Sequence, residues 1–394
     1  MHRIVTRSWH CYHSSMTQAS SGSSRWWLLP VGIVTASVFI ALGIVVFQPS
    51  FIEEVFAERL SAQTAGSSFG GAKQPTGEAA EDCSGARASD YQCVQKRYQD
   101  LVHGSGVQVA FTELKGAYET DEFVKSNCHQ ITHVIGRAAV DLYGDIPESY
   151  SNGDNFCWSG YYHGAMEAVV AEIGPDKILD EANGICASVS EDQEQSFYHY
   201  NCVHGLGHGF MGVLENELFE SLETCDSLGD RWERESCYSG VFMENIMADI
   251  NPGNKTKYLK AEEPLYPCNE VDSEYKTQCY VMQTSYALKT VDNDFGKVFE
   301  LCGTAEDEYR TTCYQSLGRD ASGNSASDLV KTKESCMQGG DDEARSNCVI
   351  GAVKDFISYY NSDTQAKEFC ESLDRDLRET CLETGEEYYE AFDV

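Results

Sequence analysis

Basic residues are scarce in this sequence. Its 394 residues include 29 Lys and Arg against 63 Asp and Glu, which gives a formal net charge of −34 at pH 7. A chain of this charge repels nucleic acid and anionic lipid headgroups, so we expect no nucleic-acid partner. A solvated acidic surface is the simplest interpretation of the charge, and attraction of cations or basic partners is the alternative.

Closely spaced cysteine motifs are also absent, although the sequence has 17 cysteines. Because it contains no Cys-x-x-Cys, the spacing fits neither zinc ribbons nor iron–sulfur runs, and covalently attached haem is excluded. The P-loop pattern of nucleotide-binding proteins is missing as well. Cysteines this numerous and this widely spaced favour disulfides, which form in oxidising compartments outside the cytoplasm.

One long hydrophobic run stands near the N-terminus. Residues 26–47, WWLLPVGIVTASVFIALGIVVF, carry no charge and are long enough to cross a bilayer as a helix. Three arginines and no acid precede this run, whereas all the acidic residues follow it. We therefore expect an uncleaved single-pass signal anchor, with the N-terminus cytoplasmic and the rest of the chain periplasmic or extracellular.

The sixteen cysteines after the hydrophobic run fall into eight couples. In the C-terminal half the first cysteines of successive couples are separated by steps of 34 residues, and each has a second cysteine 11 or 12 residues later. A fixed period of this size indicates a repeat architecture. The predicted disulfides are Cys83/Cys93, Cys128/Cys157, Cys186/Cys202, Cys225/Cys237, Cys268/Cys279, Cys302/Cys313, Cys336/Cys348 and Cys370/Cys381.

Each couple marks a helical hairpin. Around Cys302 and Cys313, in VFELCGTAEDEYRTTCYQSLGRDA, an apolar helix ends at the first cysteine and a second helix begins among acids that suit its N-terminal dipole. One hairpin is too small to bury its own core, so neighbouring hairpins must stack. We predict an all-α fold, an α-solenoid-like stack of disulfide-stapled hairpins with a period of about 34 residues. It resembles tetratricopeptide-type α-solenoids in the period alone, since their Trp, Leu-Gly and Tyr pattern is absent.

The chain divides into five parts on this basis. The stretch between the hydrophobic run and Cys83 is rich in Gly, Ala and Ser, as a flexible linker is. The predicted parts are a cytoplasmic tail (1–25), a transmembrane signal anchor (26–47), a flexible linker (48–82), His-rich helical repeats (83–215) and C-terminal Cys-paired helical repeats (216–394).

Six of the ten histidines lie between residues 129 and 208. The pairs His129/His133 and His204/His208 have a spacing of four residues, which places both imidazoles of a pair on one face of a helix. His163 and His208 each follow a cysteine of their repeat by six positions. Because equivalent positions of neighbouring repeats lie side by side in a stack, we expect these five side chains to converge.

Converging imidazoles suit a transition metal, Zn, Cu or Fe, among which the sequence does not choose. The predicted ligands are His129, His133, His163, His204 and His208. Glu167 and Glu244 are predicted as additional ligands or as general bases, and hence as the candidate catalytic residues. Three ligands with one open position would form a catalytic site, and four or more could hold two metals. His199 is expected to be peripheral.

Two other interpretations of the histidines remain open, a polar pocket for an organic ligand and structural packing in the core. The nearby Met166, Met211 and Met243 would favour copper as ligands, but methionines at helical spacing are more often core residues.

Glycines surround the histidines, although glycine weakens a helix by up to about 1 kcal/mol relative to alanine. Gly160 and Gly205 each follow a cysteine by three positions, a recurrence shared with repeats that lack histidine, so we assign them to helix packing. Gly164, Gly207 and Gly209 are additional, and could let a ligand or a backbone approach closely.

The sequence therefore favours a membrane-anchored extracytoplasmic metalloprotein with a multi-His site. If it is an enzyme, metal-activated water or oxygen chemistry is the expected reaction class. The alternative is a non-catalytic, disulfide-rich scaffold that presents its repeat surface to a protein or peptide partner. An enzyme needs an open coordination position in the N-terminal repeats, whereas a scaffold needs an exposed groove along all of them.

Overall fold

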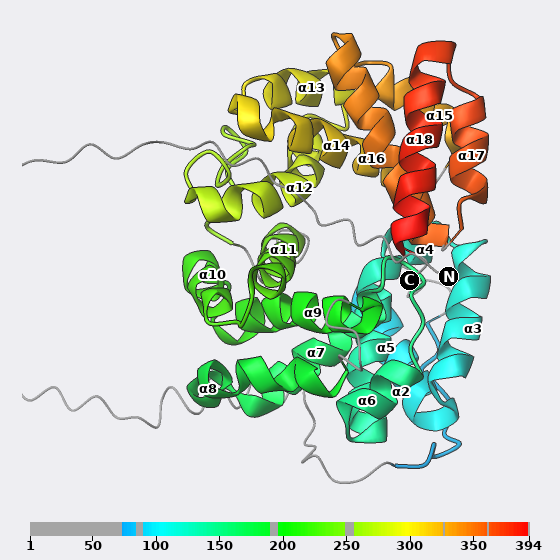
Figure 1. Cartoon of the computed structure of the whole chain (residues 1–394). Coiled ribbons are helices and arrows are strands. Elements are labelled where there is room, and N and C mark those ends of the chain that lie inside the picture. Colours follow the sequence, from blue (N-terminus) through cyan, green and yellow to red (C-terminus); the bar gives the residue numbers. More distant parts are fainter. Residues whose placement is uncertain are drawn as a thin grey trace, which may run out of the picture. The chain divides into compact units, whose positions relative to one another are not determined.

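The computed structural model of the chain describes residues 73–83, 90–189, 196–248, 256–325, 328–360 and 362–392, and every regular element in these ranges is a helix (Figure 1). The predicted all-α fold is therefore confirmed for the described part of the chain. The predicted tail 1–25, the predicted anchor 26–47 and the predicted linker as far as residue 72 lie outside the described residues. Among the described helices, none has the length and apolar character needed to cross a bilayer.

Long helices form a consecutive series in which each packs against the next. In chain order these are α2 (Tyr91–Ser105), α5 (Cys128–Tyr143), α7 (Gly160–Ile173), α9 (Phe197–Val213), α11 (Arg231–Ala248), α12 (Ser273–Thr290), α14 (Asp307–Asn324), α16 (Asp342–Tyr360) and α18 (Arg375–Phe392). From α12 onward they begin at intervals of 33 to 35 residues, which is the spacing that the cysteine period predicts.

Shorter helices precede or connect the long ones. These are α3 (Val107–Tyr118), α4 (Glu122–Ser126), α6 (Ile146–Ser151), α8 (Pro175–Ile185), α10 (Leu218–Asp226), α13 (Phe295–Gly303), α15 (Leu329–Cys336) and α17 (Thr364–Glu371), with a 3₁₀ turn at Cys186–Ser188. α10 packs on α11, α13 on α14, α15 on α16 and α17 on α18. Each of these four pairs is a helical hairpin of the predicted kind.

Acidic side chains and glycines set the helix ends. Asp294 and Asp328 precede α13 and α15, and their carboxylates accept hydrogen bonds from backbone N–H groups of the first turn. α5 ends at Gly144, which adopts the left-handed conformation that glycine tolerates best. The helix boundaries thus follow from local chemistry that is visible in the sequence.

Eight disulfides join the described segments, and they pair the cysteines as the spacing predicts: Cys83–Cys93, Cys128–Cys157, Cys186–Cys202, Cys225–Cys237, Cys268–Cys279, Cys302–Cys313, Cys336–Cys348 and Cys370–Cys381. In the four hairpins the first cysteine lies near the end of the short helix and the second about two turns into the long one. Closing a loop of about a dozen residues stabilises a fold by on the order of 3 kcal/mol.

Three couples depart from the predicted hairpin pattern. Cys83 lies in residues 73–83, which form no helix, so its disulfide with Cys93 of α2 does not join two helices. Residues 256–272, the expected first arm of one hairpin, form turns rather than a helix, because Pro264 and Pro267 have no backbone N–H to donate. Cys128 begins α5 and Cys157 lies in the turn before α7, so their disulfide joins two neighbouring long helices rather than the two arms of one hairpin.

The segment before α2 is held against the helices. The backbone N–H of Lys73 donates to the carbonyl of Leu142 at 2.7 Å, and that of Thr76 donates to the carbonyl of His103 at 2.8 Å. Residues 73–82, the end of the predicted linker, therefore belong to the folded part of the chain.

Glycines let the long helices approach one another closely. A Cβ atom at Gly164 would overlap the backbone of His133 in α5, and one at Gly207 would overlap the carbonyl of Cys237 in α11. A Cβ atom at Gly209 would meet a side chain of α7. The extra glycines beside the histidines thus serve helix packing, which decides between the two roles that the sequence left open.

The N-terminal and C-terminal helices of the described chain are in contact. The indole Nε1 of Trp158, before α7, donates to Oδ1 of Asp355 in α16 at 3.1 Å, and its ring lies 5.0 Å from that of Tyr359. The hydroxyl of Tyr359 donates to that of Tyr118 in α3 at 3.1 Å. A buried carboxylate therefore takes part in joining the two ends of the helical series.

We expect Asp355→Asn to stabilise the fold at neutral pH. Burial raises the pKa of Asp355 to about 6, against the lowering effects of Trp158 and Arg319. The folded carboxyl holds its proton more tightly than the unfolded one, so its stabilising contribution is complete below about pH 4 and is lost as the pH rises through about 6. Asparagine keeps an oxygen acceptor for Trp158 and cannot ionise.

Urea unfolding of both proteins at several pH values tests this expectation. The unfolding free energy of the variant minus that of the wild type should increase by about 2 kcal/mol between pH 4 and pH 7. A difference that does not change with pH would contradict it.

Candidate metal centre

The structure brings the five predicted histidine ligands together from three neighbouring helices. His129 and His133 lie on α5, His163 on α7, and His204 and His208 on α9. The ring centroids are 4.6 Å apart in the α5 pair and 5.1 Å apart in the α9 pair. The ring of His163 lies 4.5 Å from that of His204 and 5.4 Å from that of His129. The predicted convergence is therefore correct.

The repeat period determines which side chains meet across the helices. His133 on α5 is bonded to Glu167 on α7, which lies 34 residues later, and His208 on α9 is bonded to Glu244 on α11, 36 residues later. His204 on α9 meets Ser239 on α11 after 35 residues. Each contact spans about one repeat, as expected for equivalent positions in a stack.

The two predicted carboxylates bind the outer nitrogens of two histidines. Glu167 Oε1 lies 2.6 Å from Nδ1 of His133, and Glu244 Oε2 lies 2.8 Å from Nδ1 of His208. The second oxygen of Glu167 is paired with the guanidinium of Arg137. Glu167 follows His163 by four residues on α7, but its hydrogen-bond partner, His133, is on the neighbouring helix α5.

Two further hydrogen bonds fix the tautomers of His129 and His204. Nδ1 of His129 lies 2.9 Å from the carbonyl oxygen of Cys157, which can only accept. Nδ1 of His204 lies 2.6 Å from Oγ of Ser239, whose own proton is donated to the carbonyl of Ser236. Both histidines must therefore donate from Nδ1, and so must the two that face carboxylates. All four Nε2 atoms then carry lone pairs.

These lone pairs face one another at short distance. Nε2 of His129 lies 3.0 Å from Nε2 of His133, and Nε2 of His204 lies 3.2 Å from Nε2 of His208. When both rings of a pair are neutral, each uses its one N–H at Nδ1, so no proton lies between the two Nε2 atoms. Two nitrogens bound to one tetrahedral metal at about 2.0–2.1 Å would lie about 3.3 Å apart, close to both separations.

Burial favours the uncharged form of three of the five imidazoles. It lowers the pKa of His129 to about 3 and holds the pKa values of His163 and His204 well below the usual range, with neighbouring histidines adding to the effect. Neutral imidazole is the form that binds metals. For Glu167, burial raises the pKa, but the nearby His133 and Arg137 outweigh it and hold the pKa well below the ordinary value.

The charge around the imidazoles favours a cation. The carboxylates of Glu167 and Glu244 are offset by one guanidinium, that of Arg137, which leaves the immediate surroundings one unit negative when both acids are ionised. His129, His133 and His163 form one group of donor atoms that could hold a metal ion. A second such group is His163, His204 and His208, and a third is Glu167, His208 and Glu244. Nitrogen donors of this kind suit Zn, Cu or Fe.

The Cys128–Cys157 disulfide is part of this site. Cys128 immediately precedes His129, and the carbonyl of Cys157 accepts the hydrogen bond that fixes the tautomer of that histidine. Cys157, Trp158 and Ser159 all have positive φ values, between 55° and 58°, which few residues other than glycine adopt. The disulfide and this left-handed turn together direct the Cys157 carbonyl at His129.

Sequence reasoning did not identify Arg137 or Ser239. Arg137 follows His133 by four residues, as His133 follows His129, so all three share one face of α5. Ser239 follows its cysteine by two positions, as His204 does. Both signals were present in the sequence, but their meaning depends on which helix lies opposite.

The remaining candidates lie outside the cluster. His199, expected to be peripheral, is buried on α9 and its Nε2 lies 3.1 Å from a carboxylate oxygen of Glu233. Met166 and Met211 are fully buried in the core, and Sδ of Met166 lies 3.5 Å from Sγ of Cys202. His199 belongs to none of the groups of His, Cys, Asp and Glu that could hold a metal ion within the described ranges.

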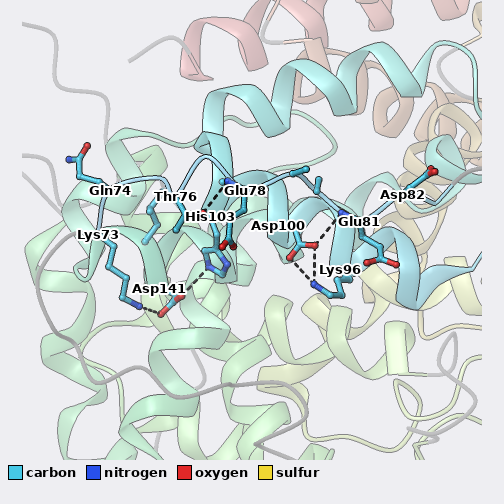
Figure 2. A pocket seen from close by; sticks show the side chains of 14 residues that line it. Lys73, Gln74, Thr76, Glu78, Glu81, Asp82, Lys96, Asp100, His103 and Asp141 are labelled. Atoms are coloured by element: carbon cyan, nitrogen blue, oxygen red, sulfur yellow. Dashed lines mark hydrogen bonds and ion pairs between the residues drawn. The ribbon is translucent and has the colours of Figure 1, made fainter.

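A separate pocket of about 810 Å³ lies beside α2 and contains none of the predicted site residues (Figure 2). Its charged groups pair within the pocket: Lys73 lies 2.6 Å and His103 lies 3.0 Å from carboxylate oxygens of Asp141, and Lys96 lies 2.9 Å from those of Asp100. The Lys73–Asp141 pair holds the segment before α2 against α5.

No known protein family, characterised protein or solved structure matches this chain. The function must therefore be inferred from the site itself.

Glu244→Gln should weaken metal binding by about 10–100-fold, because carboxylates that bind the outer nitrogen of a ligand histidine orient the ring and raise its basicity. The matched control is Glu233→Gln, which alters the same kind of His–Glu pair between α9 and α11, outside the cluster. Competition titration with a chromophoric chelator measures both affinities. Equal affinities in the two variants would exclude the role proposed for Glu244.

Replacing Cys128 and Cys157 by serine should also weaken metal binding, by at least about tenfold, because the carbonyl that fixes the tautomer of His129 is released. The control replaces Cys302 and Cys313, which close a hairpin remote from the histidines in sequence, and should lower stability alone. Metal titration and thermal unfolding of both variants distinguish the two effects. A similar loss of affinity in both would show that the disulfide acts through general stability.

Proposed function

We propose that this protein is an extracytoplasmic metalloprotein whose five clustered histidines bind a transition metal. The observation that carries the proposal is the pair of Nε2–Nε2 contacts at 3.0 and 3.2 Å, with all four corresponding Nδ1 protons directed elsewhere. Facing lone pairs repel one another in the absence of a cation, and a bound metal turns both contacts into a stabilising arrangement.

The expected reaction class is metal-activated water or oxygen chemistry. Such a metal lowers the pKa of a bound water or holds a small oxygen-containing molecule. Of the two carboxylates, Glu244 is the better general base, because both oxygens of Glu167 are bonded, one to His133 and one to Arg137. Glu167 then acts as a positioning residue for His133.

The remaining parts of the proposal concern architecture and location. We propose that the helical hairpins form a solenoid-like stack and that residues 26–47 anchor the protein in a membrane, with the repeats periplasmic or extracellular. The eight disulfides are compatible with such an oxidising compartment. If the protein is instead a non-catalytic scaffold, we propose that its repeat surface binds a protein or peptide partner.

Metal analysis of the oxidised protein tests the proposed function. The wild type should retain stoichiometric metal after dialysis, whereas His133→Ala/His208→Ala should lose it, because each substitution removes one nitrogen from a facing pair. His199→Ala, which removes a buried histidine of α9 outside the cluster, should leave the metal content unchanged.

Two outcomes would contradict the proposal. Metal that persists unchanged in the double variant would place the binding site elsewhere. Absence of metal from the wild type, even after incubation with Zn²⁺, Cu²⁺ or Fe²⁺ in turn, would favour a non-catalytic scaffold.

A further inference from the structure

The five histidines form two overlapping sets rather than one. His129, His133 and His163 can direct their donor atoms at one point, and His163, His204 and His208 can do so at another. His163 is the residue that the two sets share. Its ring lies 5.5 Å from that of His133 and 5.0 Å from that of His208, so it contacts both the α5 pair and the α9 pair, which meet directly at His133 and His208, 5.3 Å apart.

His163 differs from the other four histidines in its hydrogen bonding. Each of the others donates from Nδ1 to a neighbouring oxygen, whereas Nδ1 of His163 is buried and has no partner among the described residues. No hydrogen bond in the described part of the chain fixes its tautomer. A buried imidazole nitrogen without a partner destabilises a fold, so such a nitrogen in a cluster of ligands calls for a bound group.

The helix packing places His163 there by construction. α7 packs on α5 at one side and on α9 at the other. Gly164, next to His163, lies against the backbone of His133, and Gly205, next to His204, lies against Met166 and His163. Side chains larger than hydrogen at these two glycines would separate the helices and move His163 away from one of the histidine pairs.

We propose that the site binds two metal ions and that the imidazole of His163 is shared between them. This inference rests on the proposed function. One ion is held by Nε2 of His129 and His133, the other by Nε2 of His204 and His208, and each ring nitrogen of His163 binds one ion. On binding, the single N–H bond of neutral His163 breaks and its proton passes to water. Each of the two ring nitrogens then forms a bond to one metal ion.

The negative charge around the cluster offsets part of the charge of the two ions. The imidazolate of His163 adds a negative charge to the net single negative charge left by Glu167, Glu244 and Arg137. Glu167 is bonded to the α5 pair and Glu244 to the α9 pair, and both carboxylates lie within 4.8 Å of a nitrogen of His208. Each ion then has three nitrogen ligands and keeps an open position.

Copper loading of the full chain in oxidised form tests the proposal. The wild type should bind two Cu²⁺ per chain, and an imidazolate bridge should couple the two spins, so that the electron paramagnetic resonance signal accounts for little of the bound copper. His163→Ala and His163→Gln should abolish the coupling, and the remaining copper should give its full signal. His199→Ala should behave as the wild type.

Circular dichroism and thermal unfolding of the two His163 variants establish that they fold, and the wild-type spin count tests the bridge without any substitution. One ion per chain in the wild type, lost in His133→Ala/His208→Ala, would overturn the shared site while leaving the proposed function intact. Two ions with a full signal in the wild type would overturn the bridge. No bound metal in any variant would overturn both proposals.

Discussion

The close approach of successive long helices is the constraint on which the site depends. Glycines lie where α5, α7, α9 and α11 meet, and a Cβ at Gly164 or Gly240 would overlap the backbone of His133 or His204. At this separation a short polar side chain on one helix reaches its equivalent on the next, about 34 residues later. The disulfides hold the two arms of each hairpin together. The close packing of successive long helices then pairs side chains that are about one repeat apart in the sequence.

The same spacing serves a different chemistry in the C-terminal half. There the hydroxyls of Thr284 and Ser285 on α12 donate to the carboxylate of Asp320 on α14, at 2.6 and 2.8 Å and after 36 and 35 residues. These buried groups satisfy one another without leaving a lone pair unpaired. Polar contacts between helices therefore occur in both halves. Facing histidine nitrogens occur, within the described residues, in the His129/His133 pair of α5 and in the His204/His208 pair of α9.

The hydrogen bonds outside the cluster determine what the cluster can bind. The carbonyl of Cys157, the hydroxyl of Ser239 and the carboxylates of Glu167 and Glu244 each take the proton-bearing nitrogen of one histidine. These hydrogen bonds orient the four imidazoles and direct their Nε2 atoms inward. Because the tautomers are set before any ion arrives, binding requires little reorganisation of these four side chains.

Local sequence patterns were enough to predict the helical hairpins, their disulfides and the identity of the clustered histidines. The cysteine period, the helix caps and the i,i+4 spacing are local or periodic. The residues that carry these signals lie within a few helical turns of the residues that they position. The predicted hairpin was wrong at residues 256–272, where two prolines prevent a helix. The roles of Arg137 and Ser239 were not predicted, because they depend on which helix lies opposite.

Three relations could be found in the tertiary structure alone. These are the nitrogen of each imidazole that faces inward, the acid that binds each histidine, and the contact of His163 with both histidine pairs. These relations depend on the offset and the distance between neighbouring helices. A shift of one turn would pair different side chains while leaving the period, the caps and the cysteine spacing unchanged. The chemistry of the site is therefore set by the contact between repeats, which the composition of a single repeat does not fix.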